Sequence, residues 1–491
     1  MLPLTPFMGR QRELALLQQQ WAAEQASLLI LYGRRRVGKS RLIQHWIETS
    51  RPRVLYWMAE ATSAPDQLRS FSQALYLFEN GHEPPEAFTY ASWGQVLQQV
   101  ARLAREARFG LVLDEFTYLL AITPGIASLI QKAWDLELSR ANAFIILSGS
   151  HIGMMHRELL SHQAPLYGRA TALLQLQPLP FAITRQYFSA YRADARVAAY
   201  AILGGIPAYW ERFRQRLSLN ENIRQHLLSD VYLLQNEPRL LLQDFLSDVH
   251  NYVSILRALA NQRRTPKEIG AYTGLNDRHL TMYLSNLCAT GFVDRRVPVT
   301  ARGSSRQGRY AITDPFLRFY FRFLSHRQIQ LAQGQSEPAL EEIKRHLLDF
   351  IGTHTWEELS REWLLAASAR HKLPYLPDQV GSAWNREAQV DVVGINSMEK
   401  TCYLGECKWS PQPVDVEVLA DLFAKANQFI PAQGEWRVYF LGFARGGWTS
   451  EARQLLRRFR ELAPVGSNWK SGGLQLLTLE DVDEDLATWN G

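Results

Sequence analysis

Cysteine is scarce in this sequence, with only Cys288, Cys402 and Cys407 among 491 residues. The three form no C-x-x-C pair and are too few for a disulfide framework. Such usage is typical of a reducing compartment, so we expect a cytoplasmic protein. Long apolar runs are missing too, since none approaches the roughly 18 residues of a membrane span. The first residues also lack the charged and apolar regions of a signal peptide, so we expect no membrane partner.

Lysine is the second scarce residue. Counting along the sequence gives 9 lysines and 45 arginines, and the formal net charge is +6 with a pI of about 9.1. This positive excess permits a polyanionic partner such as nucleic acid without requiring one. The arginine preference fits phosphate contact, for which the guanidinium fork is suited, and it fits coding bias as well. The length suggests roughly three or four domains.

The stretch 33–40, GRRRVGKS, fits G-x-x-x-x-G-K-[ST], the loop that binds nucleotide phosphates. An apolar run precedes it, and apolar residues at helical spacing follow it. Its glycines let backbone N–H groups approach phosphate oxygens at a helix N-terminus. Lys39 would reach the β- and γ-phosphates, and the Ser40 hydroxyl would bind Mg²⁺. We expect ATP as the cofactor, bound by Gly33, Arg34, Arg35, Arg36, Val37, Gly38, Lys39, Ser40 and Arg41.

The segment 109–116, FGLVLDEF, reads as a buried strand that ends in Asp114 and Glu115. Open α/β sheets bind ligands at the carboxyl ends of such strands. Asp114 would therefore bind Mg²⁺, and Glu115 would orient and deprotonate the attacking water. The alternative is an ordinary acidic pair on a solvated surface.

Polar residues also accompany the two later strands of this region. The strand at 144–150 ends in Ser148 and Ser150, either of which could sense the γ-phosphate, although a plain Ser/Gly turn is the alternative. Arg169 precedes a strand near 172–176 and is suited to stabilise transition-state charge in its own subunit or a neighbour's. A surface salt bridge is the alternative for Arg169. The sequence allows the homo-oligomer that action on a neighbour requires.

Strands and helices alternate through this region, which predicts a mostly parallel sheet with helices on both faces. The pattern then changes. Residues 245–323 read as three helices and two short strands, with Thr265 and Asn276 as N-caps, which is typical of a winged helix-turn-helix. Such modules bind DNA or serve as spacers between proteins. If this one binds DNA, the residues facing phosphate are Arg278, His279, Arg295, Arg302, Arg306 and Arg309.

A third group of chemical residues lies near the C-terminus. Asp391, in QVDVVGI, and the pair Glu406 and Lys408, in CYLGECKW, fall on two strands joined by a short turn. Glu406 and Lys408 share one face, which can meet Asp391 across the hairpin. Two carboxylates there can bind Mg²⁺ or Mn²⁺ that activates water. A helix over 339–370 supplies further acids, and the order helix, strand pair, helix, strand is that of the PD-(D/E)xK nuclease core. A degenerate core with a surface Glu406–Lys408 pair is the alternative.

Taken together, the segments FMGRQREL, ILYGRRRVGKSRL, LVLDEF, FIILSGS, APLYGR and GGIPAYW resemble the archaeal-type P-loop ATPases, which are AAA/STAND-like enzymes also found in bacteria. ITDPFLRFYFRF, HTWEEL, QVDVVGI and GECKW resemble the uncharacterised C-terminal domain that commonly follows them and is held to be related to PD-(D/E)xK nucleases. The resemblance implies an α/β fold with an additional-strand ATPase core. It implies a core at 1–180, a helical lid at 181–244, a winged helix-turn-helix at 245–335 and a nuclease-like domain at 336–491.

The resemblance also assigns roles to individual residues. Glu357 matches the helical acid of the nuclease-like domain and is expected to bind metal with Asp391 and Glu406. Arg169 matches the arginine of the Leu-Tyr-Gly-Arg box. The chain departs from the family at Gln389, where the family more often has glutamate, which would weaken a second metal site.

These features predict an ATP-hydrolysing protein that acts on DNA and carries a metal-dependent nuclease-like domain. One alternative is an ATP-driven switch whose winged helix binds DNA or protein and whose nuclease-like end is inactive. Another is a chaperone-like ATPase that acts on protein.

Overall fold

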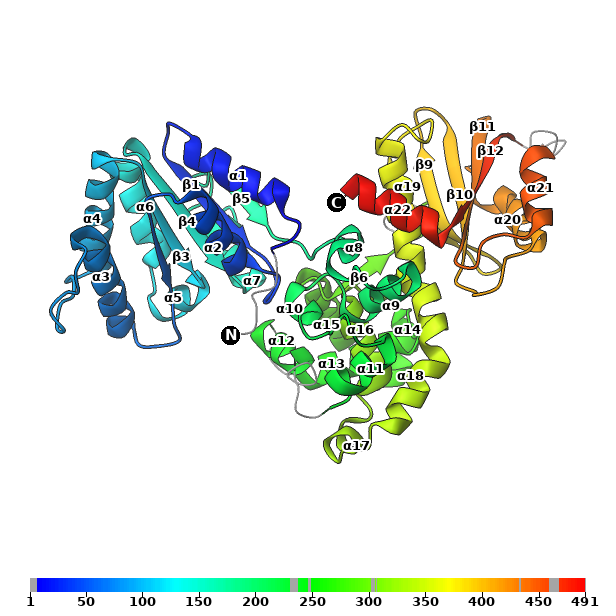
Figure 1. The fold of residues 1–491 in the computed structure, drawn as a ribbon, viewed down its shortest axis with the longest axis horizontal. Coiled ribbons are helices and arrows are strands. Elements are labelled where there is room, and N and C mark those ends of the chain that lie inside the picture. Colours follow the sequence, from blue (N-terminus) through cyan, green and yellow to red (C-terminus); the bar gives the residue numbers. More distant parts are fainter. Residues whose placement is uncertain are drawn as a thin grey trace. The chain divides into compact units, whose positions relative to one another are not determined.

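A computed structural model of the chain describes residues 7–229, 237–245, 249–301, 305, 307–431, 434–458 and 468–490. The chain forms two compact units. The first comprises residues 1–179 with the short segment 206–208, and the second comprises 180–205 and 209–491. Figure 1 shows the elements of each unit, coloured along the sequence. The segments expected as a lid, a winged helix and a nuclease-like domain thus belong to the second unit, except for residues 206–208 of the expected lid, and the boundaries between them stay predictions.

A five-stranded sheet forms the centre of the first unit. All its strands are parallel, in the order β2-β3-β4-β1-β5. The strand β4 therefore lies between the strand before the phosphate loop and the strand that ends in the acidic pair, which is the additional strand that the sequence led us to expect. The strands are β1 Ser27–Tyr32, β2 Val54–Met58, β3 Phe109–Asp114, β4 Ala143–Gly149 and β5 Ala172–Gln175.

Apolar side chains of this sheet are buried on both faces, as parallel strands require. On one face, Phe144 of β4 contacts the rings of Trp21 and Trp46. On the other face, strand residues such as Leu111 and Ile145 share a core with residues of α3, α4 and α6. This sandwich confirms the predicted α/β architecture. The helices of the unit include α1 Gln11–Ala22, α2 Lys39–Ser50, α3 Ala64–Asn80, α4 Trp93–Glu106, α5 Phe116–Ile122 and α6 Ile126–Leu136.

The second unit begins with short helices. The expected lid, residues 181–244, is largely helical, as predicted, but it consists of several short helices. Its longest described helix is α9. Arg196 of α9 is buried and forms an ion pair with Asp483 of the far C-terminal helix α22, at 2.5 Å between Nη2 and Oδ2. The elements are α8 Thr184–Tyr187, α9 Ala193–Leu203, α10 Pro207–Trp210, α11 Leu219–Asn222, α12 Glu237–Phe245 and α22 Leu479–Asn490.

Three helices and a two-stranded antiparallel sheet come next. Thr265 and Asn276 are the N-caps of the second and third helices, as predicted, and Thr265 forms a full capping box with Glu268. Arg302 and Arg306, two of the predicted phosphate contacts, lie outside the described residues. The elements are α13 Val249–Ala260, α14 Pro266–Thr273, α15 Asp277–Ala289, β6 Val293–Arg296 and β7 Arg309–Ile312.

The chain ends in a mixed five-stranded sheet of order β12-β11-β10-β9-β8. The predicted hairpin is confirmed, because β9 and β10 pair antiparallel, whereas β10, β11 and β12 run parallel. The strands β8 and β12 were not predicted, since both contain glycines that weaken a strand pattern. The strands are β8 Gln379–Trp384, β9 Gln389–Asn396, β10 Thr401–Lys408, β11 Trp436–Ala444 and β12 Trp469–Thr478.

Helices before and between these strands complete the unit. The predicted long helix over 339–370 is two α-helices joined by one π-helical stretch, Ile351–Trp356. None of the helices in the described part of the chain has the length and apolar character that crossing a membrane requires. The helices are α16 Pro315–Phe319, α17 Gln328–Ala332, α18 Glu337–Phe350, α19 Glu357–Ala369, α20 Val416–Phe429 and α21 Ser450–Arg458.

Candidate nucleotide site and acid cluster

The phosphate loop connects β1 to α2 at the carboxyl edge of the first sheet. Gly38 has φ 103° and leaves open space where a Cβ would be, so the loop can hold a ligand close to its backbone. Gly33 packs so tightly that a Cβ would lie 2.5 Å from the Leu176 carbonyl oxygen. The Lys39 ammonium donates to the carbonyl oxygens of Gly33, at 3.0 Å, and Arg34, at 3.3 Å. The loop and its lysine therefore have the folded shape that phosphate binding needs.

Asp114 and Glu115 lie at the end of β3, as predicted. Asp114 is fully buried, and Glu115 adopts a left-handed backbone with φ 49° directly after the strand. Burial lowers the pKa of Lys39, while the charges of Glu115 and then Asp114 oppose that shift. The lysine and the two acids thus interact electrostatically across the carboxyl edge of the sheet.

Tyr56, on β2, is a residue of this site that the sequence did not reveal. Its hydroxyl donates to Asp114 Oδ2 at 2.6 Å and also interacts with the Ser40 side chain. Burial and then the hydrogen bond to Asp114 raise the pKa of Tyr56. The tyrosine therefore connects the two residues that were expected to bind Mg²⁺. Nothing in the pattern of β2 pointed to it, because the contact depends on the pairing of β2 with β3.

Arg10 is a second residue that the sequence did not assign to the site. Its guanidinium donates to the Val37 carbonyl oxygen at 3.2 Å and pairs with Glu13 at 3.1 Å. The residue before it, Gly9, has φ 65°, which lets the chain turn into α1 at this point. Arg10 thereby braces the phosphate loop from the start of the chain.

Of the two serines at the end of β4, one contacts the acidic pair. The Ser150 hydroxyl donates to Glu115 Oε2 at 2.8 Å. Ser148 is buried inside β4, and its hydroxyl oxygen has no hydrogen-bond partner within the described residues. Ser150 is thus the serine that can orient Glu115.

Arg169 lies at the opposite edge of the sheet from the phosphate loop. It precedes β5, and the next residue but one, Thr171, bonds to Leu28 near the start of β1. Because β1 is six residues long and a strand rises about 3.3 Å per residue, some 15–20 Å separate that edge from the loop. Its guanidinium forms a forked ion pair with Asp135, in which Nε lies 2.9 Å from Oδ1 and Nη2 lies 2.9 Å from Oδ2. The structure does not bring Arg169 to the loop of its own chain.

Asp391 and Glu406 face each other across the β9–β10 hairpin. The pairing register ends at Gly405 opposite Val392, so its next step sets Glu406 opposite Asp391. Directly opposite residues of antiparallel strands point to the same face with Cβ atoms about 5 Å apart. Lys408 joins them, with its ammonium 2.7 Å from Glu406 Oε1. Glu406 and Lys408 thus contact each other, and the charge of Asp391 acts on both.

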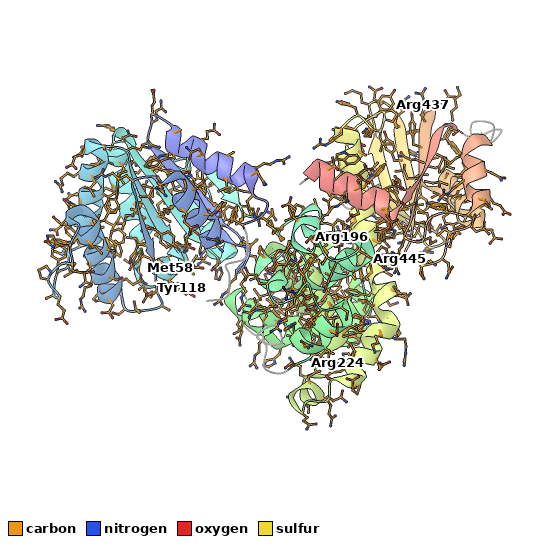
Figure 2. All side chains as sticks on the ribbon, in the orientation of Figure 1. Met58, Tyr118, Arg196, Arg224, Arg437 and Arg445 are labelled. Carbon is orange, nitrogen blue, oxygen red and sulfur yellow. The ribbon has the colours of Figure 1, made fainter. Side chains whose placement is uncertain are left out.

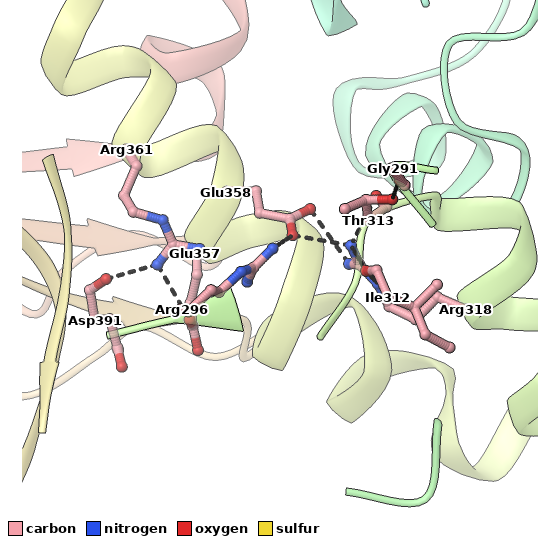
Figure 3. Close-up of polar contacts among 9 residues, drawn as sticks. All are labelled: Gly291, Arg296, Ile312, Thr313, Arg318, Glu357, Glu358, Arg361 and Asp391. Carbon is pink, nitrogen blue, oxygen red and sulfur yellow. Dashed lines mark hydrogen bonds and ion pairs between the residues drawn. The ribbon is translucent and has the colours of Figure 1, made fainter. Parts of the chain in front are cut away.

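Glu357 of α19 belongs to the same neighbourhood, but an arginine stands between the helix and the hairpin. Arg361 donates to Glu357 Oε2 at 3.3 Å and to the backbone oxygen of Asp391 at 2.7 Å, as Figure 3 shows. Within the described ranges, no three carboxylate, thiol or imidazole groups form a cluster that could hold a metal ion. The three predicted metal ligands are therefore near one another without forming a closed coordination site.

The acids of this neighbourhood repel one another. Burial and then the charge of Asp391 raise the pKa of Glu357 to about 8. The same two causes raise the pKa of Glu406, against the attraction of Lys408. Glu406 Oε2 is buried and has no hydrogen-bond partner within the described residues, with Lys425 at 3.7 Å as its closest cation. These groups have the chemistry of a cation site, since buried carboxylates that repel one another favour added positive charge.

Glu358, the next residue of α19, forms ion pairs with arginines away from the hairpin. It pairs with Arg296 at 3.1 Å and with Arg318 at 2.9 Å, on the side of the helix toward the β6–β7 sheet (Figure 3). Charge from both arginines lowers its pKa despite burial, which alone would raise it. Of the adjacent acids, only Glu357 is directed to the hairpin.

Two protein families match the chain. Residues 7–213 match the family described as an ATPase domain predominantly from Archaea. Residues 320–418 match a family of archaeal and bacterial proteins of unknown function. The first match contains the phosphate loop and the acidic pair. The second contains Glu357, Asp391, Glu406 and Lys408.

Individual proteins are also similar to the chain. An uncharacterized protein of Methanocaldococcus jannaschii is 29 % identical over 429 residues, which cover 86 % of this chain and 92 % of the relative. An uncharacterized ATP-binding protein of the same organism is 43 % identical over 51 residues, which cover 10 % of this chain and 86 % of the relative. Among solved structures, the Walker-type ATPase of Pyrococcus abyssi has a TM-score of 0.48 and 20 % identity, over 65 % of this chain and 99 % of that one.

Proposed function

We propose that the chain, whose residues 7–213 match an ATPase domain found predominantly in Archaea, binds and hydrolyses Mg·ATP and acts on DNA through a nuclease-like C-terminal domain. The observation that carries the first half is the convergence of Lys39, Asp114 and Glu115 at the carboxyl edge of one parallel sheet. That edge is where such sheets bind nucleotides.

Each residue of the nucleotide site has a role in this proposal. Lys39 leaves the loop carbonyls and binds the β- and γ-phosphates. Ser40 and Asp114 would hold Mg²⁺, which neutralises phosphate charge. The Tyr56 hydroxyl, which interacts with both residues in this structure, would then release them. Glu115 accepts the proton of the attacking water, and Ser150 fixes its carboxylate. Arg169 can stabilise the transition state only in a neighbouring subunit, because it lies far from the loop of its own chain.

The test separates ATP binding from hydrolysis. We expect Lys39→Ala to lose both, measured as nucleotide affinity and phosphate release. Glu115→Gln keeps ATP binding and lowers turnover about 100-fold or more, the usual effect of removing a general base. The matched control is Glu106→Gln, at an exposed glutamate of α4 that forms a surface pair with Arg102. ATP turnover that survives Lys39→Ala would refute the proposal.

The proposed action on DNA rests on the hairpin acids and on the module before them. Asp391 and Glu406, with Glu357, would hold Mg²⁺ or Mn²⁺, which supplies an activated water and charge for a phosphodiester. Lys408 lies where it can orient that water or neutralise phosphate. We propose that the three helices and the β6–β7 sheet form a winged helix that binds DNA. Two of the six predicted phosphate contacts, Arg278 and His279, are exposed at the start of α15.

Plasmid cleavage tests the nuclease-like half. We expect the wild-type chain to nick DNA with Mg²⁺ or Mn²⁺ and Asp391→Asn and Glu406→Gln to abolish nicking. Glu435→Gln is the control, because Glu435 is an exposed acid of the same domain that pairs with Lys470. DNA binding itself should weaken steeply with salt, by a log–log slope of about 0.9 per phosphate contact. A flat salt dependence would favour action on protein instead.

A second candidate function is an ATP-driven switch with an inactive C-terminal domain. It is favoured by the internal pairing of the acids, since Arg361 contacts Glu357 and Lys408 contacts Glu406. In an inactive domain these cations replace the metal permanently. Calorimetric titration with Mn²⁺ decides between the two. A binding isotherm that Glu406→Gln removes supports the nuclease-like site, and the absence of binding supports the switch.

A further inference from the structure

A small cavity in the second unit lies beside the acid cluster and shares Glu357 with it. It measures about 40 Å³ and lies among α19, the β6–β7 sheet and the first strands of the C-terminal sheet. A single buried water needs roughly 10–15 Å³, so this cavity can hold a small polyatomic group. Arg296 and Glu357, two of its lining residues, are drawn in Figure 3. The other polar side chains that line it are Arg264, Arg309, Tyr310, Thr353, His354, Ser382 and Gln389.

Positive charge in this cavity is not balanced. No carboxylate within the described residues lies at ion-pair distance from Arg264 or Arg309. The Arg309 guanidinium donates to the neutral amide oxygen of Gln389 at 3.1 Å and lies 4.7 Å from the centre of the Trp384 ring. Arg296 shares Glu358 with Arg318. Three guanidinium groups thus line one small space. Glu357, the carboxylate of the lining, is paired with Arg361, and Glu358 is shared between Arg296 and Arg318.

The surroundings increase the excess of charge. Burial lowers the pKa of Arg264 against the charge of Glu357, and it lowers the pKa of Arg309 against the charge of Glu268. Burial and the neighbouring arginines lower the pKa of His354 well below its ordinary value, so its imidazole is neutral and can donate a hydrogen bond. An anion bound here would restore the missing interactions.

We propose that this cavity binds a phosphate group, held by Arg264, Arg296 and Arg309. Guanidinium groups donate forked hydrogen bonds that match phosphate oxygens, and three of them surround a tetrahedral anion on several sides. The ligand is a free phosphate ion or a backbone phosphate of a nucleic-acid strand. The site requires no metal and no bond cleavage, so it goes beyond the proposed function and does not depend on it.

Inorganic phosphate is the first probe, titrated calorimetrically into the full chain carrying Lys39→Ala, in which the nucleotide loop no longer contributes. We expect a binding isotherm that the double variant Arg264→Gln, Arg309→Gln weakens about tenfold or more, since bonds from charged groups are lost. The second variant is Ser382→Asp, which sets a carboxylate into the cavity. It should abolish phosphate binding without unfolding, because it pairs with the arginines. Its control is Ser450→Asp, the same change at an exposed position of α21.

A short duplex DNA is the second probe and distinguishes the sources of phosphate. If the group belongs to a nucleic acid, the double variant lowers DNA affinity and reduces the log–log salt slope by about 1–2. Phosphate binding with an unchanged DNA slope identifies the free ion as the ligand. If Ser382→Asp and the double variant leave both phosphate binding and the DNA slope equal to their controls, the cavity is not a phosphate site. That result would leave the ATPase and nuclease proposals untouched, since neither gives Arg264, Arg309 or Ser382 a part in catalysis or metal binding. Of these three residues, only Arg309 is also a predicted DNA contact of the winged helix.

Discussion

At the scale of single residues, Tyr56 occupies a position that magnesium needs. Its hydroxyl bonds to Asp114 and Ser40. In our proposal, the side-chain oxygens of Asp114 and Ser40 must leave Tyr56 when Mg·ATP binds. We expect Tyr56→Phe to lower the Mg²⁺ concentration for half-maximal ATP turnover about two- to tenfold, because one competing hydrogen bond is removed. Turnover measured across a Mg²⁺ titration tests this. Tyr118→Phe, at an exposed tyrosine labelled in Figure 2, is the control and should change nothing.

Glu357 makes a pH-dependent contribution to stability. Its pKa in the folded protein is about 8, above the ordinary value of 4.5. Between these two values the folded state holds a proton that the unfolded state has released, so stability falls as pH rises from about 4.5 to about 8. We expect Glu357→Gln to make stability less dependent on pH in this window, measured by denaturation at several pH values. Glu387→Gln, at an exposed glutamate of the same domain, should keep the wild-type dependence.

At the scale of elements, the sequence predicted the parts whose chemistry is local. The phosphate loop, the acidic end of β3, and the hairpin of β9 and β10 each follow from a short pattern of glycine, apolar and charged residues. Tyr56 and Arg361 could not be predicted, because each reaches its partner through the pairing or packing of separate elements. The same holds for Arg169, which the sequence located just before a strand without showing at which end of the sheet that strand begins. Glycine at 381, 472 and 473 concealed β8 and β12.

The ion pair between α9 and α22 is an element-level contact with a large expected effect. Arg196 and Asp483 have side chains only 9 % and 5 % exposed. Asp483→Ala leaves a buried guanidinium without its partner, which costs about 3–5 kcal/mol of unfolding free energy. The control is Glu337→Ala in the exposed pair with Arg224, which should cost about 0.5 kcal/mol or less. Arg196 and Arg224 are both labelled in Figure 2. Chemical denaturation that gives equal losses for the two variants would contradict the expectation.

At the scale of the whole molecule, the two compact units predict two unfolding transitions. ATP binds to only one of them in our proposal, so it should raise only one melting temperature. At a ligand concentration 100 times Kd, the stabilisation is about 2.7 kcal/mol, or roughly 5–10 °C for a unit of this size. Calorimetric scans with and without ATP measure the shift, and Lys39→Ala should abolish it. A single transition, or equal shifts of both, would mean that the units do not unfold independently.

The distance along the chain between Arg196 and Asp483 has a consequence for synthesis in the cell. The two residues are 287 positions apart. At roughly 5–20 residues per second, the ribosome needs about 15–60 s to make the residues between them. During that time α9 has been made but Asp483 has not. Arg196 therefore has no acidic partner on the nascent polypeptide. The second unit can therefore reach its native state only late in translation, and until then it is exposed to holdase chaperones and proteases.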